Sequence, residues 1–197
     1  MEWLHGFTLS VTTALWLTRL KKPLGGFTLV ELLVVLCVVA ALTTMVVPSL
    51  RSFVQEQRMT TQANEVLTVL ASARNSALHR QVRVTLCASY DQQTCHHTSF
   101  WETGWVLFTD TGVRGQLDGS DQILGSGGQL SGNSTLRAGG TFRYYVSYLP
   151  NGMSQGSGGL ANDTLRLCDA RGREYARSII INVTGRVRIR KGASQCP

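Results

Sequence analysis

A group of basic residues near the C-terminus has the residue types and the spacing that most directly indicate chemistry. Arg186, Arg188 and Arg190 alternate with apolar residues, and Lys191 follows them. In an extended strand alternate side chains share a face, so the three guanidinium groups would project together, about 7 Å apart. A guanidinium keeps its charge and donates two hydrogen bonds to one phosphate. The pattern therefore indicates a phosphate-binding strand; it is equally typical of the solvent face of an edge strand, where charge discourages aggregation.

The positive charge of the chain is concentrated around this group. The formal net charge is +7, and between residue 166 and the C-terminus the only acids are Asp169 and Glu174. The basic residues of the same stretch are Arg166, Arg171, Arg173, Arg177, Arg186, Arg188, Arg190 and Lys191. A phosphate-directed strand presents no helix or ribbon to the base edges, so any binding of DNA is expected to be independent of base sequence.

A single acid, Glu31, interrupts the apolar run of residues 27–47. At about 1.5 Å per residue this run spans roughly 30 Å, the thickness of the hydrocarbon core of a bilayer. An uncompensated carboxylate in lipid costs at least about 2.5 kcal/mol, so Glu31 is expected to have a cationic partner. In the alternative interpretation, the side chain reaches the membrane interface from the start of the helix.

Basic residues precede this run. Arg19, Lys21 and Lys22 come shortly before Gly25 and Gly26. In a secretory signal peptide the cleavage site follows the apolar stretch, whereas here the small residues precede it, so the apolar helix would be retained. By the positive-inside rule, the N-terminus stays in the cytoplasm and the chain beyond the run crosses the membrane.

Four cysteines, Cys87, Cys95, Cys168 and Cys196, follow the apolar run, while Cys37 lies within it. In an oxidising compartment these four thiols favour two disulfides, with three possible connectivities. We favour Cys87 with Cys95, which closes a short loop, and Cys168 with Cys196, which pins the C-terminal tail. The second bond would add about 2 to 4 kcal/mol of stability.

The residues most like metal ligands are the Cys-His-His run at 95–97, with Cys87 and His79 nearby. Adjacent histidines point in different directions and no second spaced pair completes a site, so solvated loop histidines are the better interpretation. Acids such as Asp118 and Asp121 are scattered over predicted loops and form no paired-carboxylate pattern. We therefore predict no metal, no cofactor and no enzymatic activity.

One helix and a set of strands are expected to position these residues. Apolar residues recur at three- and four-residue steps and predict an amphipathic helix over 48–79, with Pro48 expected to kink or loosen the helix. The period then changes to two, and strands are predicted at 82–86, 105–109, 141–148, 164–168, 178–183 and 186–190. Glycine-rich loops are predicted at 112–121, 125–140 and 151–162. A long helix followed only by strands predicts an α+β fold, with the helix packed on an antiparallel sheet.

The sequence GGFTLVELL at 25–33, with Pro48 beyond it, resembles the N-terminus of type IV pilins and pseudopilins. The resemblance implies that a prepilin peptidase cuts after Gly26 and that the new N-terminal Phe27 is methylated. It also implies that Glu31 pairs with the free amine of Phe27, usually that of a neighbouring subunit, as the helices pack into a filament.

Further motifs narrow the resemblance to the GspH/FimT group of minor pilins: ARNSA at 73–77, WETGWVLFTD at 101–110, PNG at 150–152 and TGRVR at 184–188. FimT-type minor pilins that act in natural transformation bind DNA through a Gly-Arg-x-Arg element. The residues that match this element begin at Gly185 and include Arg186 and Arg188, and Arg190 and Lys191 extend the charge.

Together these features predict a leader at 1–26, a transmembrane helix at 27–47, an amphipathic stalk at 48–79 and a globular β domain at 80–197. The expected protein is a single-pass protein of the bacterial inner membrane, with its globular domain in the periplasm, that assembles with other pilin subunits into an extracellular pilus. The expected function is sequence-independent DNA binding during competence. The alternative is a structural minor pilin or type II secretion pseudopilin that does not bind DNA.

Overall fold

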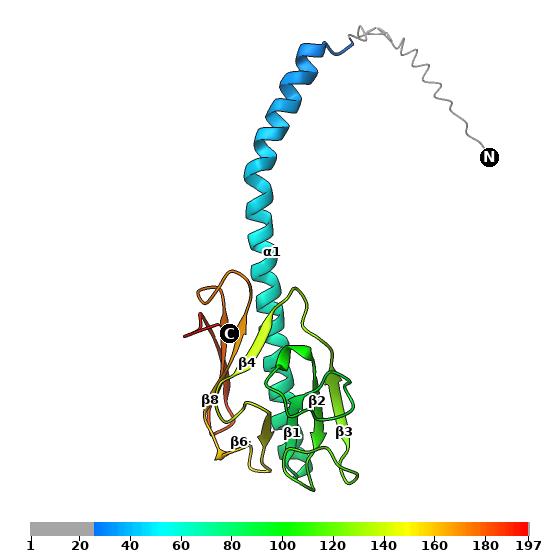
Figure 1. Cartoon of the computed structure of the whole chain (residues 1–197), viewed down its shortest axis with the longest axis vertical. Coiled ribbons are helices and arrows are strands. Elements are labelled where there is room, and N and C mark those ends of the chain that lie inside the picture. Colours follow the sequence, from blue (N-terminus) through cyan, green and yellow to red (C-terminus); the bar gives the residue numbers. More distant parts are fainter. Residues whose placement is uncertain (1–25, 197) are drawn as a thin grey trace, which may run out of the picture. The chain divides into compact units, whose positions relative to one another are not determined.

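The structure, a computed structural model, describes residues 26–196 as one long helix, a short 3-10 helix and ten strands (Figure 1). The chain divides into two compact units between Val46 and Val47. The predicted leader, including Gly25 and the basic residues before it, lies outside the described residues.

Helix α1 runs from Leu29 to Arg80 without interruption. The hydroxyl of Thr28 accepts a hydrogen bond from the backbone N–H of Glu31 at 3.2 Å, which is the pattern of a helix N-cap. The helix continues through Pro48 as a single element. Proline removes one backbone donor, and the intact hydrogen bonds on both sides of it are enough to keep the helix continuous.

The N-terminal unit of the described chain consists of the first part of α1. Every residue from 26 to 46 is exposed, although most are apolar. By length and composition this stretch is suited to cross a membrane. Its apolar surface needs a partner other than the fold of this chain.

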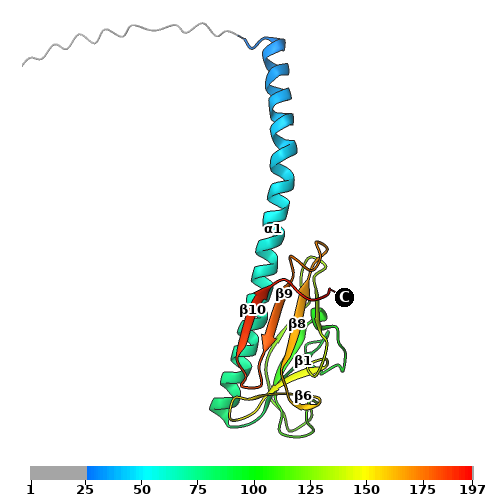
Figure 2. The ribbon, with the colours of Figure 1, turned by 90° about the vertical axis from the view of Figure 1, so that its left-hand side faces the viewer.

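Ten strands form two antiparallel sheets (Figures 1 and 2). The first sheet has the order β3-β2-β1-β5-β6-β7 and consists of β1 (Val84–Ala88), β2 (Trp105–Thr109), β3 (Ile123–Gly127), β5 (Tyr145–Tyr148), β6 (Ser154–Gly156) and β7 (Gly159–Leu160). The second sheet has the order β10-β9-β8-β4 and consists of β4 (Thr135–Ala138), β8 (Asp163–Cys168), β9 (Arg177–Ile181) and β10 (Val187–Lys191). The 3-10 helix η1 (Trp101–Thr103) precedes β2.

The strands differ from the predicted ones mainly where glycine is frequent. Strand β2 coincides with the predicted strand at 105–109, but β3, β4, β6 and β7 lie wholly or largely in stretches predicted as loops. These strands have two to five residues each and lie toward the edges of their sheets. Backbone hydrogen bonds to neighbouring strands define them, and their sequences show little of the apolar alternation that predicts a strand. Strand β1 starts two residues later than predicted, and all five of its residues are buried because strands flank it on both sides.

One face of α1 packs against both sheets in the C-terminal unit. Leu70 and Ala73 of this face are fully buried in a core that includes Leu86 of the first sheet and Leu165 of the second. Burial of each large apolar side chain contributes about 1.5 to 3 kcal/mol. The first buried residue in the described chain is Met59, so a fragment of residues 52–197 retains the whole described core.

The four cysteines outside the apolar run form two disulfides in the structure. Cys87 is bonded to Cys95, with the Cα atoms 5.7 Å apart, and Cys168 is bonded to Cys196, with the Cα atoms 5.9 Å apart. Cys37 is free and exposed. The second disulfide fixes the C-terminal tail to strand β8.

Candidate nucleic-acid interface

Strands β9 and β10 form the C-terminal hairpin, with Val187 opposite Ile181 and Lys191 opposite Arg177. The turn between them is closed by a hydrogen bond from the N–H of Gly185 to the carbonyl of Asn182 at 2.7 Å. Gly185 has φ +75°, in the left-handed region that glycine adopts without strain. Glycine is therefore required where the predicted Gly-Arg-x-Arg element begins.

The turn is also anchored to α1 by Arg74. The Arg74 guanidinium donates to the carbonyl of Gly152 at 3.0 Å and to the carbonyl of Thr184 at 3.0 Å. A side chain on Gly185 would collide with the Gly152 carbonyl and meet the Arg74 guanidinium. Arg74 lies far in the sequence from both of its partners, so the sequence alone does not predict these two hydrogen bonds.

Arg188 and Arg190 share one face of β10, and Arg186 directly precedes the strand. Arg186, Arg188 and Arg190 are exposed, whereas Val187 and Ile189 are half-buried against the core. Strand β10 is an edge strand, and none of the three arginines forms an ion pair within residues 26–196. The strand therefore presents a row of uncompensated guanidinium groups on a backbone that the hairpin holds in place.

Lys191 does not lie in this row. Its ammonium group is 3.3 Å from a carboxylate oxygen of Glu56 on α1, and Arg177 donates to the same carboxylate at 2.5 Å. The hydrogen bond from Arg177 lowers the pKa of Glu56, opposed by desolvation and supported by Lys191. Glu56 is therefore ionised at neutral pH and compensates part of the Lys191 charge, so Lys191 is not brought together with Arg186, Arg188 and Arg190.

The predicted processing and assembly residues all belong to the N-terminal unit. Gly26, Phe27 and Glu31 are exposed, and Gly26 has open space where a side chain would lie. The Glu31 carboxylate has no ion pair among the residues that the structure describes. The pairing of Glu31 with a cation therefore stays a prediction.

The histidines and acids for which the sequence predicts no functional role do not gather into one site within the described residues. Within residues 26–196, no group of three or more His, Cys, Asp or Glu side chains is arranged to hold a metal ion. Asp118 and Asp121 accept hydrogen bonds from backbone and hydroxyl groups of their own loop. Asp110 is buried; desolvation raises its pKa, although Thr85 and the N–H of Gly115 donate to it. These acids order the β2–β3 loop.

Comparison with known proteins identifies the family of this chain. The model of the family described as type II transport protein GspH matches residues 62–185. A comparison with curated proteins found no match. The stretch matched by the family model includes most of the strands and the turn that leads into β10.

Two crystal structures of the type IV minor pilin FimU from Pseudomonas aeruginosa share the fold. One has a TM-score of 0.57 at 17% sequence identity, over 74% of this chain and 99% of FimU. The other crystal form has a TM-score of 0.54 at 16% identity, over 71% of this chain and all of FimU. One long N-terminal helix packed on antiparallel sheets is the type IV pilin fold that these structures share. The chain belongs to the GspH family of type IV minor pilins and pseudopilins.

Proposed function

We propose that this minor pilin binds DNA without sequence preference and supports DNA uptake in natural transformation. The observation that carries the proposal is the row of Arg186, Arg188 and Arg190, exposed and free of ion pairs within the described chain, at the start of and along the edge strand β10. Guanidinium groups about 7 Å apart match twice the phosphate repeat along one strand of DNA, which is about 3.4 Å. The anchored turn at Gly185 favours binding because it fixes the first arginine before DNA arrives.

The N-terminal unit supports a proposed route to the filament. A prepilin peptidase removes residues 1–26, Phe27 becomes the methylated N-terminus, and its amine pairs with Glu31 of a neighbouring subunit. Before assembly, the segment 27–47 holds the protein in the inner membrane with its globular domain in the periplasm. Assembly into the pilus then covers the exposed apolar surface of the N-terminal unit and carries β10 out of the cell.

A second candidate function is that of a purely structural subunit of a pilus or of a type II secretion pseudopilus. The description of the matching family, a type II transport protein, favours this alternative. In such a subunit the arginine row would only keep the edge of the sheet soluble. The two candidates differ in whether DNA binds.

A gel-shift titration of residues 52–197 tests the proposal. We expect a shift with duplexes of unrelated sequence and an affinity that falls as salt rises. Three phosphate contacts predict that the logarithm of the binding constant falls with the logarithm of salt concentration at a slope of about −3. Absence of binding at low salt would overturn the DNA-binding function and leave the structural subunit.

A further inference from the structure

The outer face of the second sheet extends the basic surface beyond β10. Its inner face, away from solvent, carries the core residues that pack toward α1. On the outer face, Arg190 lies opposite Ser178 of β9, Ser178 opposite Arg166 of β8, and Arg166 opposite Arg137 of β4. Side chains opposite one another in antiparallel pairs lie on the same face. Basic residues therefore occur on three of the four strands of this face.

The C-terminal tail covers part of that face. The Ser178 hydroxyl donates to the carbonyl of Gly192 at 2.6 Å, and Cys196 is bonded to Cys168 of β8. Figure 2 shows the tail running from the end of β10 across β9 and β8. Ser178 is buried, whereas Ile180 and Thr164, in the row of Arg188, are half-buried. The open part of the face is therefore the row that begins at Arg188.

Arg166 reaches toward this open row and is uncompensated. Its guanidinium lies over Gly139, where an added side-chain carbon would be 2.9 Å from the Arg166 Nη1 atom. No ion pair joins Arg166 to an acid in residues 26–196, whereas its neighbour Arg137 is paired with Glu102. Two strand spacings separate Arg166 from β10, a distance of about 10 Å. A second phosphate position beside the arginine row is thus available.

The same face leads at β4 to an aromatic pocket. The guanidinium carbon of Arg137 lies 4.4 Å from the centre of the Phe100 ring. Phe100 lines a pocket of about 530 Å³ together with Tyr90 and His96. Phe100 and Tyr90 are 52% and 67% exposed, and the rings of Tyr90 and His96 lie 3.7 Å apart between centres. Large aromatic side chains that are not covered by the fold favour stacking with a planar ligand.

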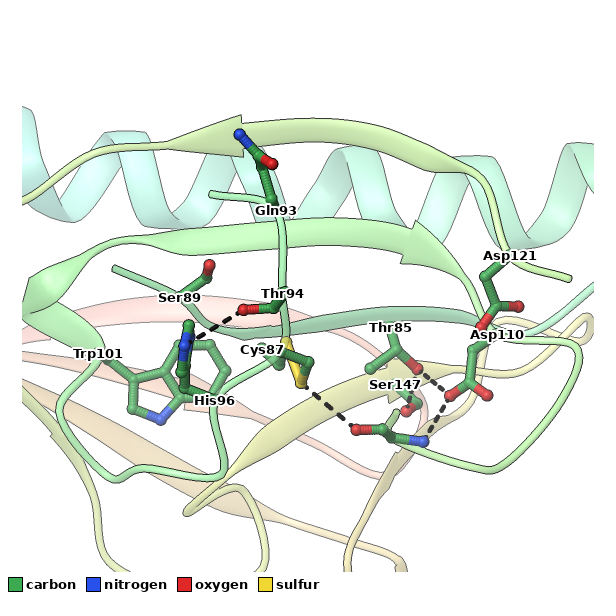
Figure 3. The surroundings of a disulfide bond; sticks show 12 residues. Thr85, Cys87, Ser89, Gln93, Thr94, His96, Trp101, Asp110, Asp121 and Ser147 are labelled. Carbon is green, nitrogen blue, oxygen red and sulfur yellow. Dashed lines mark hydrogen bonds between the residues drawn. A yellow bond between two sulfur atoms is a disulfide. The ribbon is translucent and has the colours of Figure 1, made fainter. Parts of the chain in front are cut away.

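His96 also lines this pocket, and its ring is held in the loop that follows β1. Nδ1 of His96 is buried and has no hydrogen bond within the described residues, although its Nε2 atom lies 3.2 Å from the Thr94 hydroxyl. Figure 3 shows His96 joined to Thr94 by a hydrogen bond, on the loop that the disulfide of Cys87 closes. The disulfide holds the loop that carries His96 close to β1. The pocket thus presents exposed aromatic rings on a loop that a disulfide holds, as suits stacking with a nucleobase.

Resting on the proposed function, we propose that single-stranded DNA crosses this face from Arg188 past Arg166 and inserts an unpaired base into the Tyr90–Phe100 pocket. From β10 to β4 the path spans three strand spacings, or roughly 15 Å, which about four stacked nucleotides cover, and Phe100 lies against Arg137 of β4. Unpaired bases stack on aromatic rings, whereas bases inside a duplex are not free to do so. Duplex DNA would use only the arginines, so the pocket confers a preference for single strands.

Fluorescence anisotropy with labelled single-stranded and duplex 12-mers tests this path on residues 52–197. The double variant Y90A/F100A is expected to bind single strands about tenfold more weakly, the loss of roughly one stacked base, and duplex with unchanged affinity. R166Q is expected to weaken single-strand binding severalfold. The matched control is R114Q, which removes an exposed arginine from the β2–β3 loop.

The outcomes separate this inference from the function on which it rests. If the unaltered protein binds neither form of DNA, the proposed function fails. If it binds both forms, and neither Y90A/F100A nor R166Q changes single-strand affinity more than R114Q does, the path is wrong and the arginine strand remains. Equal losses for single strands and duplex in Y90A/F100A would also overturn the base pocket. Thermal unfolding of each variant verifies the fold; Tyr90 and Phe100 are exposed and Arg166 is half-buried, so a large change in stability is not expected.

Discussion

Replacing Arg186 and Arg188 together with glutamine is expected to lower the affinity of residues 52–197 for DNA by about 10- to 100-fold. A hydrogen bond to a charged group contributes about 1.5 to 3 kcal/mol, and each 1.4 kcal/mol is tenfold in affinity. The exposure of both arginines lowers the expected contribution of each contact to about 1 kcal/mol, and two such contacts give a loss within the stated range. Because two phosphate contacts disappear, the slope of log affinity against log salt should shrink from about −3 to about −1.

The control for this experiment has the same change in net charge. Arg80, at the end of α1, and Arg114, in the β2–β3 loop, are exposed and lie off β10, and the R80Q/R114Q variant removes both. We expect this control to bind DNA nearly as well as the unaltered protein, since the position of the charge matters more than its sum. Unchanged affinity in R186Q/R188Q, or an equal loss in the control, would contradict the assignment of the site to β10.

Replacing Cys168 and Cys196 with serine is expected to lower the free energy of unfolding by about 3.5 kcal/mol. The two residues are separated by 28 positions, so the disulfide removes much chain entropy from the unfolded state. Urea unfolding at pH 7, without reductant, measures the effect through a shift in midpoint. The tail retains hydrogen bonds from Gly192 to Ala176 and from Ala193 to Arg173, so the folded domain is expected to persist.

The other disulfide provides the comparison. Cys87 and Cys95 are separated by only 8 positions, and the same entropic relation predicts a loss of about 2.5 kcal/mol for C87S/C95S. The variant lacking the Cys168–Cys196 bond should therefore be the less stable of the two. If C168S/C196S is as stable as the unaltered protein, the prediction that the Cys168–Cys196 bond stabilises the folded domain is wrong.

The sequence predicted the arginine row because the strand has one buried face. Val187 and Ile189 turn toward the core, so period two alone places Arg186, Arg188 and Arg190 together on the other side. The part of helix α1 beyond residue 47 was predictable for the same reason, since one face of it is apolar at helical spacing, whereas the part before it was predictable from its apolar run. Periodicity is informative wherever a single face of an element is covered.

Contacts between segments that are distant in the sequence could not be predicted from periodicity. The ion pair of Lys191 with Glu56 and the hydrogen bond from Arg74 to Thr184 depend on where the helix lies against the sheets. The division of the strands into two sheets was also missed, because short glycine-containing strands such as β3 and β6 carry little apolar pattern. Only their pairing partners make them strands, and a single sequence does not reveal those partners.

The most direct test of the central claim is to measure DNA uptake and piliation in the same competent cells carrying R186Q/R188Q at the native locus. We predict that transformation falls at least about tenfold, in line with the expected loss of affinity, while the number of surface pili stays unchanged. Transformation equal to that of cells with the unaltered protein would contradict a DNA-binding role for β10, and loss of pili would instead assign the arginines to assembly.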